Sequence, residues 1–132
     1  MSFETYKLIH FLGLFTLFFA FGSLFTGEKS TKAAAMGHGI GLLLMLLGGF
    51  GMQAKHSGVY LASYGSAFPM WLIIKVVIWL VLGGAMVLAK RRIITGLTAW
   101  ILIIGLGFAS AYLALNKPMF GSAPAVEAAA AE

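Results

Sequence analysis

The chain has 132 residues, of which 61% are hydrophobic and 10% are charged, whereas soluble domains average roughly 45–50% and about 25%. A soluble domain of this size could not cover its surface with so few charges, so the composition predicts an integral membrane protein and excludes a soluble enzyme. The net charge of +5 comes from basic residues beside apolar segments, which argues against nucleic-acid binding, and the absence of cysteine excludes thiolate metal sites.

Four apolar segments have the length of about 20 residues that a helix needs to cross a bilayer. They run over about 6–25, 35–54, 69–89 and 93–116. Short connections between them predict an all-α, up-down-up-down four-helix bundle over residues 1–117. The longer connection, 55–68, is expected in the headgroup region with Tyr60 and Tyr64 as interfacial anchors. Residues 118–132 form an Ala-rich tail.

Basic residues in the connections predict how the bundle is oriented, because cytoplasmic loops carry an excess of Lys and Arg. Five lie on one side and three on the other: Lys29, Lys32, Lys90, Arg91 and Arg92 against Lys7, Lys55 and Lys117. The side with five should be cytoplasmic. We therefore expect a protein of the bacterial-type inner membrane with both termini in the periplasm.

The first segment carries Tyr6, His10 and Gly13 on one helical stripe. One interpretation is an interfacial histidine that bonds a lipid phosphate or a backbone carbonyl. The other is a haem ligand or proton-relay group, with Gly13 leaving room for a macrocycle beside it.

The second segment places His38, Gly41, Gly49, Gln53 and His56 on one face. The glycines permit close helix contact, which predicts a packing seam or a face for other subunits or a second copy of the chain. His56 falls on the same side of the membrane as His10 and is the candidate second metal ligand, whereas His38 has no histidine partner on its side.

The third segment starts at Pro69, a residue suited to a helix start, and aligns Trp71, Lys75 and Trp79. An uncompensated lysine within a bilayer costs about 2.5–3.5 kcal/mol on insertion scales. Lys75 either snorkels outward or points inward to an anion such as a haem propionate. In the second case the two tryptophans would flank the ligand or cover the ammonium.

The fourth segment is mostly small or polar on one stripe and is interpreted as packing surface. Because the helices alternate in direction, one half of the membrane should collect the candidate cofactor-binding residues. These are Tyr6, His10, Gly13, Gln53, His56, Trp71, Lys75 and Trp79, with His10 and His56 as the candidate metal ligands.

Two stretches resemble a known family. The run from Tyr6 to Gly13 is similar to the first helix of the HemJ-type protoporphyrinogen oxidases and their CopD-like relatives, and the run from Pro69 to Lys75, with its basic exit at residues 90–92, is similar to that family's third helix. The resemblance implies a four-helix membrane bundle. It also implies that His10 and Lys75 bind haem b or a porphyrin. The family's second helix-one histidine and its arginine in helix two have no counterpart here.

These observations lead to three hypotheses of function. The first is a haem b-binding subunit for electron transfer, or an accessory subunit, in a membrane complex. The second is a structural or assembly subunit without a cofactor. The third is a HemJ-like oxidase.

Overall fold

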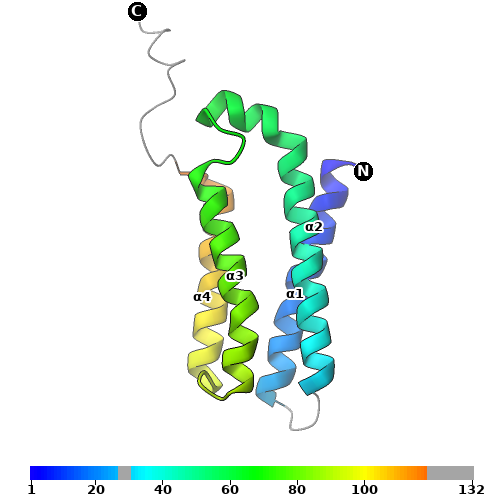
Figure 1. Cartoon of the computed structure of the whole chain (residues 1–132), viewed down its shortest axis with the longest axis vertical. Helices are drawn as coiled ribbons and strands as arrows, with labels where there is room; N and C mark the ends of the chain where they lie inside the picture. Colours follow the sequence, from blue (N-terminus) through cyan, green and yellow to red (C-terminus); the bar gives the residue numbers. More distant parts are fainter. Residues whose placement is uncertain (27–30, 119–132) are drawn as a thin grey trace, which may run out of the picture.

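The computed structural model describes residues 1–26 and 31–118, which contain four helices and no strand (Figure 1). The helices are α1 (Phe3–Thr26), α2 (Thr31–Tyr64), α3 (Met70–Lys90) and α4 (Gly96–Asn116). They run alternately up and down, so the predicted all-helical arrangement is confirmed. All four are long and apolar enough to cross a bilayer. The predicted tail, from residue 119 onward, lies outside the described residues.

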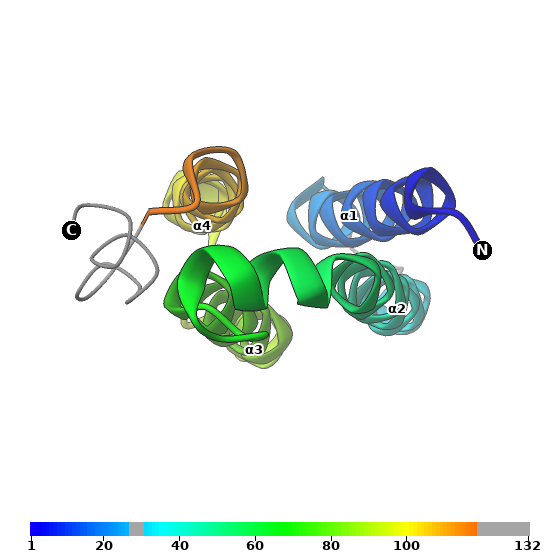
Figure 2. The ribbon, with the colours of Figure 1, turned by 90° about the horizontal axis from the view of Figure 1, so that it is seen from above.

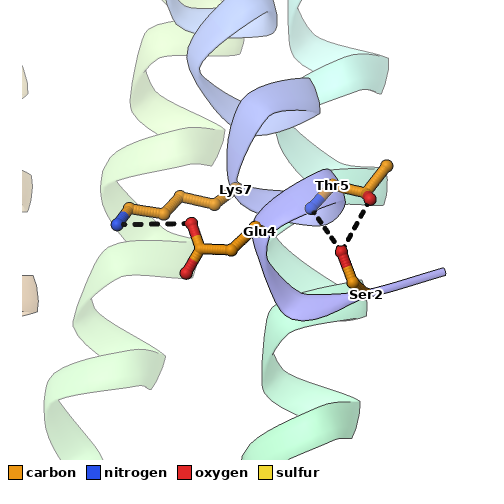
Figure 3. A network of polar contacts seen from close by, with 4 residues as sticks. All are labelled: Ser2, Glu4, Thr5 and Lys7. Carbon is orange, nitrogen blue, oxygen red and sulfur yellow. Dashed lines mark hydrogen bonds and ion pairs between the residues drawn. The ribbon is translucent and has the colours of Figure 1, made fainter.

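The start of α1 is fixed by a local polar network (Figure 3). Ser2 is the N-terminal cap, because its Oγ accepts the backbone N–H of Thr5 at 3.1 Å and lies 2.8 Å from the Thr5 hydroxyl. Glu4 and Lys7, one turn apart, form an ion pair at 3.8 Å. An acidic residue in the first turn also complements the positive end of the helix dipole.

The ends of α3 and α4 depend on backbone conformation. Pro69 caps α3, and its carbonyl accepts N–H groups of the first turn. A tight connection with left-handed conformations at Arg92 (φ 55°) and Gly96 (φ 57°) comes after α3, so α4 begins at Gly96 and not at the predicted residue 93. Lys117, left-handed at φ 42°, ends α4 by donating its N–H to the Leu113 carbonyl.

The second helix is longer than the sequence predicts. It continues through the expected connection 55–68 as far as Tyr64 and ends where Gly65 adopts φ 68°. Its last turns, green in Figure 1, lean across toward α3, as the view from above also shows (Figure 2). The prediction ended the helix where apolar sequence ends. The helix continues because Tyr60, 8% exposed, packs edge-on against Trp71 of α3.

Helices α1 and α2 are packed so closely that their backbones touch. A Cβ added at Gly13 would lie 2.5 Å from the Met45 backbone nitrogen, and one at Gly48 would lie 2.5 Å from the His10 backbone nitrogen. At Gly41 the nearest atom would be the Leu17 backbone nitrogen, at 2.8 Å. These separations leave room for hydrogen only, so glycine is required at all three positions.

This contact corrects the predicted seam. Its glycines are Gly41 and Gly48, whereas a Cβ at Gly49 would meet only the His10 ring, at an ordinary 3.5 Å. Helix α1 of the same chain covers Gly41 and Gly48, which are therefore occupied before any further subunit binds. The α1–α2 and α3–α4 hairpins lie side by side (Figure 2), and the Phe18 ring of α1 lies close to Gly107 of α4.

The molecule is apolar both inside and outside. The fully buried side chains include Leu17 and Phe21 of α1, Leu82 of α3 and Ile103 of α4. Large apolar side chains also cover the outer surface, where Phe19 is 80% exposed and Leu115 is 84% exposed. An outer surface of this kind is suited to lipid and not to water.

Candidate functional site

His10 is held by α2 through one ring nitrogen. Its Nδ1 lies 2.8 Å from the backbone carbonyl of Met45, and a carbonyl can only accept, so Nδ1 carries the proton. In the neutral imidazole Nε2 then keeps its lone pair. Nε2 has no hydrogen-bond partner within the described ranges. Metal-ligating histidines are typically held in this way, with one N–H on a carbonyl and the other nitrogen free.

Lys75 lies on the inward stripe of α3. Trp71, one turn before it, and Ile78 and Leu82 after it are all buried. Lys75 itself is partly buried and close enough to His10 to act on it electrostatically. This placement favours the predicted inward lysine over one that snorkels outward. In residues 1–26 and 31–118 the only carboxylate side chain is that of Glu4, which pairs with Lys7.

Gly13 and Tyr6 serve the contact between α1 and α2. The space beside Gly13, where the sequence predicts room for a macrocycle, is filled by the backbone of α2 at Gly41 and Met45. The Tyr6 ring lies directly on Gly51. The stripe that carries His10 therefore faces a neighbouring helix on its Gly13 side, and any ligand must approach His10 from elsewhere.

His56 lies at a different level of the bundle from His10. Its ring centroid is 4.4 Å from that of Phe3 and 6.0 Å from that of Tyr60. Phe3 precedes His10 by seven residues of α1, which is about 10 Å of helix. The two imidazoles are thus too far apart along the bundle to ligate one iron from opposite faces. No group of three or more potential metal-ligating side chains occurs in the described part of the chain.

Gln53 and Trp79 connect α2 to later parts of the chain. The Gln53 side-chain amide, which is buried, donates to the Ala67 carbonyl in the α2–α3 connection. The Trp79 indole N–H donates to the Leu42 carbonyl of α2 at 3.2 Å. Both polar groups are satisfied within the chain. Trp79 therefore anchors α3 to α2, in place of the predicted role beside a ligand.

His38 joins three helices and is 5% exposed. Its Nε2 donates to the Leu82 carbonyl of α3 at 3.0 Å, and its ring meets Phe21 of α1 edge-on at 5.1 Å. This agrees with the interpretation of the helix-two face as a packing seam. His38 belongs to the end of the bundle that holds the α1–α2 and α3–α4 connections, far from His10.

Trp71 belongs to an aromatic cluster that the sequence did not predict. Its ring packs edge-on against Tyr60 at 5.5 Å and also contacts Tyr64 at 6.5 Å. The ammonium of Lys117 lies 5.9 Å from the Tyr60 ring centroid. Hydropathy alone assigns Tyr60 and Tyr64 to a surface connection, so it gives no indication that their rings contact Trp71. The spacing of four residues between the two tyrosines was the available signal that a helix continues there.

Comparison with protein-family models, with curated proteins and with solved structures gives no significant match.

Proposed function

We propose that this chain is a multi-pass membrane protein that binds haem b and serves as an electron-transfer or accessory subunit of a membrane complex. The observation that supports it most directly is His10, whose Nδ1–H is held by the Met45 carbonyl while Nε2 has no partner among the described residues. Four apolar helices and an apolar outer surface support membrane insertion. The family resemblance of the His10 and Lys75 stretches points in the same direction.

In this proposal each residue has one task. His10 would ligate the iron through Nε2, and the Met45 carbonyl would hold the ring and its tautomer. Lys75, close to His10 and without a carboxylate partner in the described ranges, would pair with a propionate. A bound haem supplies one-electron redox chemistry, and the protein tunes it through the ligand and its surroundings.

The ligand set differs from the sequence prediction at one position. Because His56 lies about two helical turns from His10, it is not proposed as the second ligand of the same iron. The iron would have a single ligand from the described residues. Partner subunits would contribute any second ligand and would contact the outer surfaces of the hairpins, since α1 already covers the seam glycines.

An absorption spectrum of the purified protein, expressed with haem supplied, tests the proposal. We expect a Soret band, with α and β bands after reduction, and we expect His10→Ala to remove them while the helical circular dichroism is retained. His38→Ala is the matched control, since its imidazole also bonds a carbonyl, and it should keep the spectrum. Loss of the Soret band in His38→Ala with retention in His10→Ala would overturn the assignment.

A second candidate function is a structural subunit without a cofactor. The observation in its favour is that His10, His38, Gln53 and Trp79 all bond backbone carbonyls, as polar struts of a scaffold would. In that case the parent protein has no Soret band under any loading condition. A third outcome, conversion of protoporphyrinogen to protoporphyrin by the purified chain, would support the HemJ-like oxidase.

A further inference from the structure

Polar donors gather around Tyr60 where α2, α3 and α4 meet. This group, the Tyr60 cluster, consists of His56, Tyr60, Trp71, Lys75 and Lys117. Trp71 and His56 contact the Tyr60 ring at centroid distances of 5.5 and 6.0 Å, and the Lys117 ammonium lies 5.9 Å from its centroid. Lys75 comes one turn after Trp71 on α3 and is close enough to Lys117 for their charges to interact.

The cluster has donors without acceptors. Among the described residues the Trp71 indole N–H, which is buried, has no hydrogen-bond partner, and Trp71 as a whole is only 3% exposed. The Nδ1 of His56 is also buried without a partner in this part of the chain. Two like charges, Lys75 and Lys117, lie nearby, and no carboxylate of the described residues reaches them. An unsatisfied buried donor and unpaired ammonium groups are both costly to maintain.

The position of Lys117 is fixed by the fold. Its left-handed conformation ends α4, and its backbone carbonyl accepts the Tyr64 hydroxyl at 3.3 Å. Lys117 is exposed, so the cluster is open to the surroundings on that side. Apolar side chains near cluster members in the chain are also exposed: Met70, adjacent to Trp71 in α3, and Leu115, two residues before Lys117 in α4.

We infer that the Tyr60 cluster binds the phosphate of an anionic phospholipid, with Lys75 and Lys117 as counter-charges and the Trp71 N–H as a hydrogen-bond donor. A phosphate supplies the acceptor oxygens that the cluster lacks. A lipid, in contrast to a soluble anion, also has acyl chains to cover the exposed apolar side chains beside the cluster, Met70 and Leu115. Basic pockets at the ends of membrane helices bind lipid headgroups in this way. The inference concerns the haem-free protein, in which no propionate occupies Lys75.

Native mass spectrometry of the haem-free protein in detergent, titrated with dioleoyl phosphatidylglycerol or phosphatidylcholine, tests the inference. We expect phosphatidylglycerol to bind at least about tenfold more tightly, because it carries a net negative charge, whereas the choline ammonium of phosphatidylcholine is repelled by Lys75 and Lys117. Lys75→Met should weaken the binding of phosphatidylglycerol by about tenfold. Trp71→Phe, which keeps the aromatic packing, should weaken it by about threefold. Lys75→Arg should retain binding, and millimolar inorganic phosphate should not displace the lipid.

The matched control is Lys55→Met, an exposed lysine of α2, which should bind like the parent. If Lys75→Met loses its helical circular dichroism, the affinity of Trp71→Phe for phosphatidylglycerol tests the inference instead. Equal binding of the two lipids, or an equal loss in Lys55→Met, would overturn the inference, and displacement by inorganic phosphate would overturn its assignment to a lipid. His10→Ala should bind phosphatidylglycerol normally, so a failure of the haem proposal and a failure of the lipid inference remain distinguishable.

Discussion

At the scale of single residues, the buried polar side chains are of two kinds: those with a hydrogen-bond partner and those without one among the described residues. Trp79 and Trp71 lie on the same helix, two turns apart, and show the contrast directly. The Trp79 N–H donates to the Leu42 carbonyl, whereas the Trp71 N–H is buried and has no acceptor in residues 1–26 and 31–118. A satisfied donor stabilises the fold, and an unsatisfied one has a desolvation cost that something else must offset. A buried donor without an acceptor therefore indicates a site for a ligand.

We predict opposite effects on stability for the two indoles. Trp79→Phe should lower the free energy of unfolding by about 1 kcal/mol, because a hydrogen bond between helices is lost. Trp71→Phe should leave the stability of the lipid-free protein unchanged or slightly raise it, because the removed N–H has no partner in the part of the chain that the structure describes. Denaturant titration in mixed micelles, followed by circular dichroism, measures both. A larger loss in Trp71→Phe than in Trp79→Phe would contradict the prediction.

Among the helices, the closest contact in the molecule is the one between α1 and α2. This contact depends on how α2 is rotated about its own axis, because adjacent glycines of α2 have different surroundings. Gly48 faces the α1 backbone, and Gly49 faces only the His10 ring. The pair is therefore a sensitive probe of helix register.

We predict that Gly48→Ala destabilises the protein by about 1–3 kcal/mol, because the new methyl would lie 2.5 Å from a backbone nitrogen. The gain in helix propensity of about 1 kcal/mol does not offset such a clash. Gly49→Ala is the matched control and should be neutral or stabilising by up to about 1 kcal/mol. Thermal unfolding in micelles distinguishes them. Equal melting of the two variants would show that α1 and α2 do not touch as described.

Between the hairpins, individual side chains carry much of the contact. His38 reaches from α2 to the Leu82 carbonyl of α3, and Trp79 returns from α3 to α2. These bonds hold α3 beside α2 while α4 contacts α1 through Phe18 and Gly107. Trp79, a cofactor candidate in the sequence, therefore helps to position the hairpins, as does His38. His10 differs from these two residues, because its second ring nitrogen, Nε2, has no hydrogen-bond partner among the described residues.

For the molecule as a whole, orientation in the membrane is expected from loop charge. The start of α1 and the end of α4 lie at the end of the bundle that also holds the α2–α3 connection (Figure 1). We predict that an alkaline phosphatase fused after Glu132 is active and that a green fluorescent protein fused there is dark, as expected of a periplasmic C-terminus. Replacing Lys90, Arg91 and Arg92 by glutamine should weaken this preference. A bright fluorescent fusion in the parent would place the five basic residues outside.

The number of helices and their apolar character could be predicted from the sequence alone. Length and hydropathy are properties of a continuous segment, so four spans could be identified without knowing their neighbours. Short connections then required alternate directions. The errors lie at the helix ends: α2 continues ten residues beyond the predicted end at 54, and α4 starts three residues later than predicted. Both depend on turn conformation and packing, which hydropathy does not report.

Which side chains share a site depends on how the helices pack. The sequence placed His10, His56 and Lys75 at the same end of the bundle, and the structure separates His56 from His10 by about two turns. It also showed that Gly13 faces a backbone and that Tyr60 and Trp71 are partners. The cause is geometric. Each residue turns a helix by about 100°, so the crossing and rotation of whole helices decide what a side chain meets.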